Sequence, residues 1–166
     1  MSNSKNQIPN AIQNPEDKTG EENFCFIFRV QEFFLKKAKD YYIELAFVYG
    51  SRTTNHAREE SDLDIAILFS SSLTDDEIFS TITDLSLKLS ELLEVEVNII
   101  PLYEYFPKPM LYYNVVVAGI PVYISDFNKY VDFKLMALHQ MEDFTIFGLK
   151  WQIELARKNL EALKND

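Results

Sequence analysis

The sequence predicts an α/β (α+β) domain, because short β-prone runs alternate with longer amphipathic helical segments along the chain. The chain has 166 residues, of which 47% are hydrophobic and 14% aromatic, and this composition can fill one compact core. We find no internal repeat and no sign of a second domain. We therefore expect a single domain over residues 21–166, preceded by a polar tail over residues 1–20 that we expect to be disordered.

The first half of this domain is predicted to contain two helices and two strands. A helix is expected over residues 22–40, and strands are expected at Ile43–Tyr49 and Leu63–Phe69. Thr74 is the predicted N-cap of the second helix, because three acidic residues follow it in the first turn. This helix carries its apolar stripe at Ile78, Ile82, Leu85, Leu89 and Leu92.

The second half continues the alternation. A strand is expected over residues 95–100 and ended by Pro101, then a helix over residues 109–118 and a short strand at Ile120–Ile124. Asp126 is the predicted N-cap of a long C-terminal helical region, and an interruption near Gly148 is the alternative to one continuous helix. The apolar stripe of this region consists of Ile146, Leu149, Ile153, Ala156, Leu160 and Leu163.

The charge balance excludes a broad nucleic-acid-binding surface. The chain contains 26 acidic and 16 basic residues, for a formal charge of −10. This field repels the phosphates of DNA and RNA, so we expect no direct nucleic-acid partner. An acidic surface favours a basic protein partner instead.

Three further features predict a cytoplasmic protein without a membrane segment. The lone Cys25 excludes an intramolecular disulfide and suits a reducing compartment. No apolar run approaches the roughly 18 residues that a membrane-spanning helix requires. Residues 1–20 lack the apolar core of a secretory signal.

The most informative motif is Gly50-Ser51, followed after ten residues by Asp62-Leu63-Asp64. A Gly-Ser pair that leaves a strand allows the backbone to approach a phosphate closely, and Ser51 adds a hydroxyl. Strand alternation places Asp62 and Asp64 on one face. These two carboxylates repel each other unless a cation lies between them, and Mg²⁺ prefers such oxygens together with substrate phosphates. The combination predicts a site for a nucleoside triphosphate and divalent metal.

Gly50-Ser51-Arg52 and the segment 58–66 together resemble the signature of the minimal nucleotidyltransferases (MNT), a small branch of the DNA polymerase β superfamily. The hallmark of that superfamily is this Gly-Ser pair, ten-residue gap and Asp-X-Asp. The specific motif spans about residues 47–68, and weaker similarity runs from the first helix to Tyr123. The resemblance implies a nucleotidyltransferase fold, in which a short mixed β-sheet is backed by helices on one side and the site lies on the open face.

The resemblance also implies roles for individual residues. The superfamily takes a third carboxylate from a neighbouring strand, and Glu96 stands where the family usually has an aspartate. Asp62, Asp64 and Glu96 would then be catalytic and would hold two Mg²⁺ ions. Gly50, Ser51 and Arg52 would bind the nucleotide, with ATP as the substrate.

Two of these assignments have structural alternatives. Glu94, Glu96 and Asn98 can equally form the solvated side of an edge strand. Arg52 can equally be a surface charge.

MNT proteins of this kind act as antitoxins of HEPN-domain ribonuclease toxins in HEPN/MNT toxin–antitoxin systems. The resemblance therefore implies a protein adenylyltransferase (AMPylation) that transfers AMP from ATP to a tyrosine of the toxin. The HEPN pattern, Arg then four to six residues then His, is absent, since only three residues separate Arg52 from His56. Two alternatives remain: a small-molecule (aminoglycoside-like) nucleotidyltransferase, and a degenerate antitoxin that inhibits by binding alone.

Overall fold

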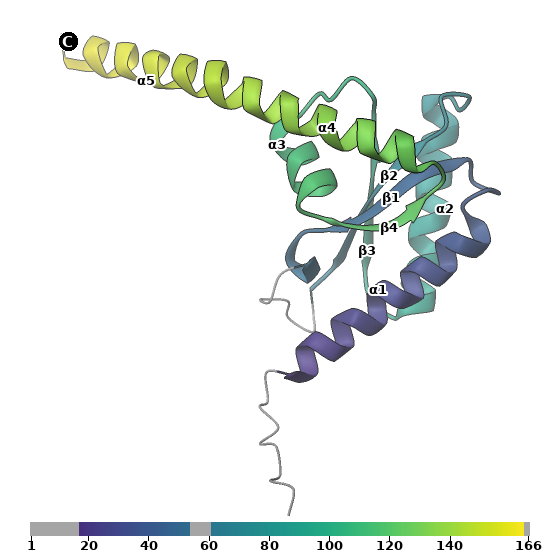
Figure 1. Cartoon of the computed structure of the whole chain (residues 1–166). Helices are drawn as coiled ribbons and strands as arrows, with labels where there is room; N and C mark the ends of the chain where they lie inside the picture. Colours follow the sequence, from purple (N-terminus) through teal and green to yellow (C-terminus); the bar gives the residue numbers. More distant parts are fainter. Residues whose placement is uncertain (1–16, 54–60, 165–166) are drawn as a thin grey trace, which may run out of the picture.

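The computed structural model describes residues 17–53 and 61–164 (Figure 1). Its centre is a four-stranded sheet in the order β3-β2-β1-β4. The strands are β1 (Ile43–Tyr49), β2 (Leu63–Phe69), β3 (Val97–Leu102) and β4 (Ile120–Ile124). β1 pairs antiparallel with β2 and β4, whereas β2 pairs parallel with β3. The predicted mixed α/β sheet is confirmed, and β1, β2 and β4 have the predicted bounds.

Helices cover both faces of this sheet. α1 (Asp17–Lys37) and α2 (Asp75–Leu93) pack on one face, where they bury residues such as Phe34 and Leu85. α3 (Pro109–Tyr112), the π-helical turn η2 (Tyr113–Val117) and α4 (Phe127–Asp143) pack on the other, where they bury residues such as Tyr112 and Phe133. The expectation that helices back only one face is therefore wrong. The second helical layer forms because residues 109–143 return across the sheet, and the sequence pattern does not show this path.

The caps predicted for the two long internal helices are present. The Thr74 hydroxyl accepts a hydrogen bond from the Glu77 backbone N–H, and the Glu77 carboxylate accepts one from the Thr74 N–H. The Asp126 carboxylate accepts hydrogen bonds from the backbone N–H groups of Asn128 and Lys129. These bonds satisfy helix donors that would otherwise lack a partner.

The boundaries of two predicted elements, the first helix and the third strand, are shifted. α1 begins at Asp17, so residues 17–20 of the predicted tail are helical, and residues 1–16 lie outside the described residues. β3 runs from Val97 to Leu102 and includes Pro101, which was expected to end it. Pro101 pairs opposite Ile67 on an edge strand, and an edge strand tolerates a residue without an N–H.

The C-terminal helical region leaves the body of the molecule. α4 passes through the π-helical turn η3 (Phe144–Gly148) into α5 (Leu149–Lys164), which extends away from the sheet (Figure 1). Ile146, Ile153 and Leu160 of the predicted apolar stripe are 55%, 68% and 60% exposed. These three side chains therefore do not pack against the core. Within the described ranges, no helix combines the length and apolar character needed to cross a bilayer.

Candidate functional site

The candidate site lies where β1 ends and β2 begins. In the sheet, Asp64 of β2 is paired with Tyr49 of β1 on one side and with Asn98 of β3 on the other. Residues 63, 65 and 67 point into the core beneath α1 and α2, so strand alternation puts Asp62 and Asp64 on the opposite face, as predicted. Asp62 is exposed and Asp64 is half-buried, so this end of the face is open to solvent.

The two carboxylates interact unfavourably with each other. Burial raises the pKa of Asp64, and the charge of Asp62 raises it further, while a hydrogen bond from the Asn98 amide opposes the rise. The pKa of Tyr49 is also raised, first by burial and then by the charge of Asp64. Negative charge is therefore concentrated here, which is an arrangement typical of functional sites.

Gly50 determines how closely the loop approaches this pair. Its φ of +80° lies in the left-handed region, which favours glycine, and a Cβ at this position would lie 2.4 Å from Oδ2 of Asp64. After Gly50 the chain enters the short 3₁₀ turn η1 (Ser51–Thr53). The backbone N–H and hydroxyl of Thr53 donate to the Gly50 carbonyl over 3.2 and 2.8 Å. This turn places the exposed Ser51 directly after the residue at which a Cβ would clash with the Asp64 carboxylate.

Arg52 lies inside the protein, with only 5% of its surface exposed. Its Nε donates to the Ser61 carbonyl over 2.7 Å, and its guanidinium lies 4.6 Å from the centre of the Phe26 ring. These contacts tie the turn to the start of β2 and to α1. The geometry thus favours Arg52 as a residue that holds the loop in place. The other loop candidates from the sequence, His56 and Arg58, lie outside the described residues.

The structure does not gather Glu96 with the aspartate pair. Glu96 is exposed and precedes β3, and its backbone carbonyl accepts a hydrogen bond from the Leu63 N–H over 2.8 Å. Among residues 17–53 and 61–164, no group of three or more His, Cys, Asp and Glu side chains is placed to hold a metal ion. The three-carboxylate cluster expected from the sequence is therefore not formed.

Asn98 is the β3 residue that reaches the pair, and the sequence analysis did not assign it to the site. Its Nδ2 lies 3.4 Å from Oδ2 of Asp62. Residues 96 and 98 have the same parity along the strand, so alternation alone does not distinguish them. The pairing register decides between them, because it sets Asn98 opposite Asp64.

These residues fit one divalent cation bound together with a nucleotide. Mg²⁺ is commonly held by one or two carboxylates while substrate phosphates supply further oxygens. Asp62 and Asp64 provide the two carboxylates on one face, with mutual repulsion that a cation would relieve. The backbone of the Gly50 turn lies so close to Asp64 that a Cβ at this position would clash with its carboxylate.

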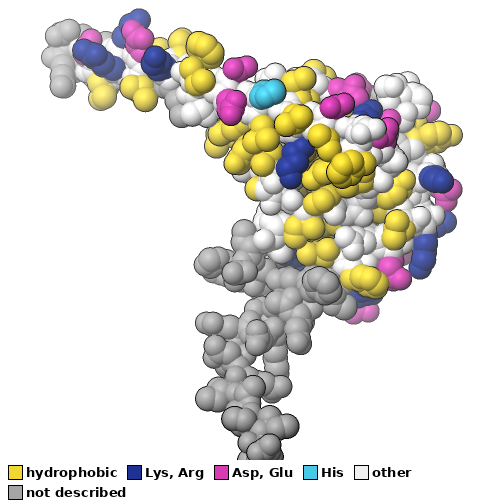
Figure 2. Space-filling model, in the orientation of Figure 1, with side chains coloured by type: hydrophobic (Ala, Val, Ile, Leu, Met, Phe, Trp, Pro, Cys, Tyr) yellow, Lys and Arg dark blue, Asp and Glu magenta, His cyan; other side chains and the backbone are white. Residues whose placement is uncertain are grey.

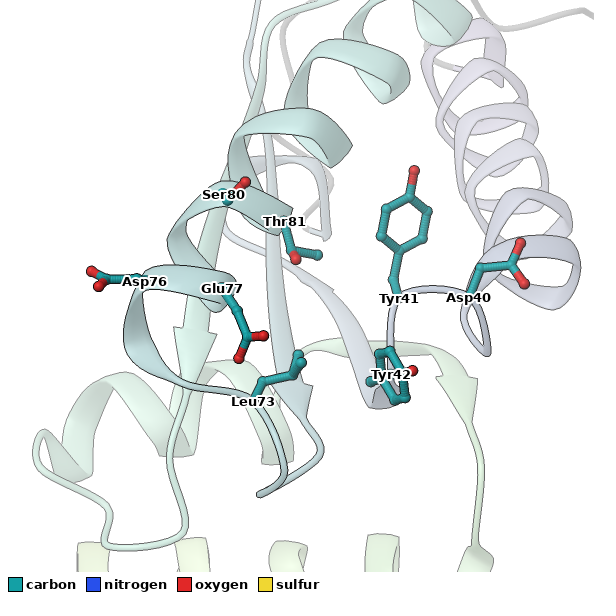
Figure 3. A pocket seen from close by; sticks show the side chains of 8 residues that line it. All are labelled: Asp40, Tyr41, Tyr42, Leu73, Asp76, Glu77, Ser80 and Thr81. Carbon is teal, nitrogen blue, oxygen red and sulfur yellow. The ribbon is translucent and has the colours of Figure 1, made fainter.

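A pocket of about 390 Å³ lies at the other end of β1 and β2 (Figure 3). It is formed between the turn that precedes β1 and the first turns of α2, and no aspartate of the candidate site lines it. Its lining residues are Asp40, Tyr41, Tyr42, Leu73, Asp76, Glu77, Ser80 and Thr81. The pocket and the candidate site are therefore separate features of the sheet.

Comparison with protein families gives a match to "Polymerase beta, Nucleotidyltransferase" over residues 31–128, which is more than half of the chain. This segment contains β1, β2, β3 and the aspartate pair. Comparison with curated proteins gives no significant sequence match.

Solved structures with a similar fold include several toxin–antitoxin complexes. A toxin–antitoxin structure with AMP-PNP is 19% identical, with a TM-score of 0.55, over 76% of this chain and 96% of that chain. A chain of the MntA-HepT complex is 18% identical, with a TM-score of 0.51, over 77% and 95%. A chain from the tri-AMPylated Shewanella oneidensis HEPN toxin in complex with MNT antitoxin is 19% identical, with a TM-score of 0.51, over 77% and 94%. At such identities the likeness establishes the fold alone.

Proposed function

Because the chain belongs to the polymerase β nucleotidyltransferase family, we propose that it is the antitoxin of a HEPN/MNT toxin–antitoxin system. In this proposal it is a cytoplasmic protein adenylyltransferase that transfers AMP from ATP to a tyrosine of the HEPN ribonuclease toxin. The observation that carries the proposal is the Asp62–Asp64 pair beside the Gly50-Ser51 turn, which suits a nucleoside triphosphate with its cation. Toxin–antitoxin complexes of the same fold support the choice of partner.

The proposed reaction is an in-line displacement. The tyrosine Oη attacks the α-phosphorus of ATP, the bond to the bridging oxygen of the β-phosphate breaks, and pyrophosphate leaves while the phenol proton passes to solvent. Bound Mg²⁺ supplies neutralisation of the phosphate charge. The chain's own residues mainly position the reactants.

Each residue of the site has a defined task in this scheme. Asp62 and Asp64 hold the cation that accompanies the triphosphate. Gly50 allows the backbone to approach the phosphates, and the Ser51 hydroxyl donates to them. Arg52 keeps the turn in place from inside the protein.

The surface of the C-terminal region supports a protein acceptor. Hydrophobic side chains gather along α5 and on the adjoining part of the body (Figure 2). Phe147 and Trp151 are 70% and 66% exposed, as is the stripe of Ile146, Ile153 and Leu160 described above. Exposed apolar side chains gathered in this way are typical of protein–protein contact surfaces. The formal charge of −10 suits a basic partner such as an RNA-cleaving enzyme.

One observation favours a second candidate, an antitoxin that inhibits by binding alone. The position beside the aspartate pair on β3 is occupied by the neutral Asn98. A site with two carboxylates can hold a nucleotide without transferring AMP.

Intact-mass spectrometry distinguishes the two candidates. The HEPN-domain protein from the neighbouring gene is incubated with this chain, ATP and Mg²⁺, with Asp64→Asn as the inactive variant and the exposed Asp132→Asn as the matched control. We expect mass increments of whole AMP units with the wild-type chain and Asp132→Asn only. A stable complex without any increment would replace the transferase by the binding-only antitoxin.

A further inference from the structure

We infer that Asn98 is the third polar group of this site, and that its neutral amide limits the chain to one divalent cation, which is carried in with the nucleotide. The inference deepens the proposed function and rests on it for the identity of the ligand. It concerns the number of ions at the site and the speed of transfer.

The register of the sheet supports this role for Asn98. Parallel pairing sets Asn98 directly opposite Asp64, and Nδ2 of Asn98 lies 3.4 Å from Oδ2 of Asp62. The same amide lowers the pKa of Asp64. One side chain from the edge strand therefore contacts Asp62 and lies opposite Asp64.

The chemistry of the amide determines what the site can bind. An asparagine is never ionised and offers one carbonyl oxygen and two N–H donors. Here the donors face the two carboxylates and partly replace a cation. Among the residues that the structure describes, the site thus has two negative charges, which match one divalent ion. A second ion beside the first would require another anionic oxygen, and the side chain of Glu96, which precedes β3, is exposed to solvent.

The consequence for transfer concerns the acceptor. With one ion accompanying the triphosphate, no carboxylate on β3 is in place to bind a second ion at the acceptor oxygen or to take its proton. The phenol proton must then pass to solvent, so we expect tight nucleotide binding with slow transfer. Asn98→Asp would supply the missing anionic oxygen without changing the shape of the side chain.

The test compares the full-length wild-type chain with Asn98→Asp, Asn98→Ala and Glu96→Gln. Mn²⁺ bound per chain is counted by electron paramagnetic resonance in the presence of AMP-PNP. We expect one ion for the wild type, Asn98→Ala and Glu96→Gln, and two ions for Asn98→Asp. If the wild type binds two ions and Glu96→Gln binds one, the inference is overturned. Glu96 would then be the third ligand. One ion in Asn98→Asp, or no ion in any variant, would also overturn it.

Melting temperatures measured without nucleotide test whether residue 98 faces the two aspartates. Recovery on addition of Mg²⁺ distinguishes charge repulsion from a general folding defect. In metal-free buffer, Asn98→Asp places three carboxylates together, so we expect its melting temperature to fall below that of the wild type and to recover when Mg²⁺ is added. If the melting temperature of Asn98→Asp is the same with and without Mg²⁺, residue 98 does not face the Asp62–Asp64 pair.

These readouts separate the inference from the proposed function. If the ion counts are as expected and the toxin is modified by neither the wild type nor Asn98→Asp, the assignment of Asn98 holds and the transferase proposal fails. If the wild type modifies the toxin and binds two ions, the transferase proposal holds and the inference fails. If both hold, Asn98→Asp modifies the toxin at least tenfold faster than the wild type.

Discussion

Replacing Gly50 by alanine should weaken both the fold and the site, for two separable reasons. The backbone at Gly50 has a φ of +80°, and forcing a residue with a Cβ into left-handed backbone costs about 1–2 kcal/mol. The new Cβ would also lie 2.4 Å from Oδ2 of Asp64. This clash involves the end of a rotatable side chain, so rotation of the Asp64 carboxylate relieves it at little cost in stability. That rotation removes the carboxylate from the cation it should hold.

We therefore expect Gly50→Ala to lower the free energy of unfolding by about 1–2 kcal/mol, which corresponds to a fall in Tm of about 2–8 °C for a chain of this size. Affinity for AMP-PNP in the presence of Mg²⁺ should fall by about tenfold or more, equivalent to about 1.4 kcal/mol. Urea denaturation followed by circular dichroism measures the first quantity, and isothermal titration calorimetry measures the second.

Gly50→Asn separates the two causes. Asparagine tolerates left-handed backbone better than alanine, but it carries the same Cβ. The asparagine variant should therefore regain part of the lost stability while its nucleotide affinity stays low. Wild-type affinity in Gly50→Ala, or recovery of affinity in Gly50→Asn, would refute the argument that Gly50 is required because Asp64 lies against it.

Three further predictions follow from the same contacts. Asp64→Asn should abolish Mg²⁺-dependent nucleotide binding and raise the Tm of the nucleotide-free protein, because the pKa of Asp64 is raised by burial and by Asp62, so its ionised form destabilises the fold. The wild type should accordingly gain stability relative to this variant as pH falls through the raised pKa, and unfolding curves that keep the same difference at every pH would contradict this. Arg52→Ala should lower the free energy of unfolding by about 1–3 kcal/mol, because the hydrogen bond to the Ser61 carbonyl is lost. Urea denaturation measures this change. An unchanged free energy of unfolding would show that the turn is stable without Arg52. Ile153→Asp, at a position that is 68% exposed, should leave Tm and nucleotide affinity unchanged and abolish toxin binding in a pull-down, whereas retained binding would place the contact surface elsewhere.

The elements that the sequence predicts well are those with strong local signals. The strands Ile43–Tyr49 and Leu63–Phe69 have the predicted bounds, because their apolar runs are flanked by clear turn residues. The caps Thr74 and Asp126 are also as predicted, since capping depends on residues only two or three positions apart. The same locality allowed the Gly50 turn to be predicted.

What the sequence does not predict mostly concerns contacts between distant segments. Glu96 and Asn98 have the same strand parity, and only the pairing of β3 with β2 places the second one beside the aspartates. The helices over the second face likewise depend on how the chain returns across the sheet. Arg52 is typical of this limit, because its partner Phe26 lies far away in sequence on α1. Hydrophobic spacing carries no information about such contacts.

Calorimetric titration of the full-length chain with AMP-PNP shows whether the Asp62–Asp64 pair beside Gly50 holds a nucleoside triphosphate with a divalent cation. The titration is made with Mg²⁺, with a chelator in place of Mg²⁺, and with the Asp62→Asn and Asp132→Asn variants. We expect saturable binding in Mg²⁺ for the wild type and Asp132→Asn, and a loss of about tenfold or more in affinity with the chelator or in Asp62→Asn. Binding that is absent in the wild type, or equally tight in all four cases, would contradict this expectation.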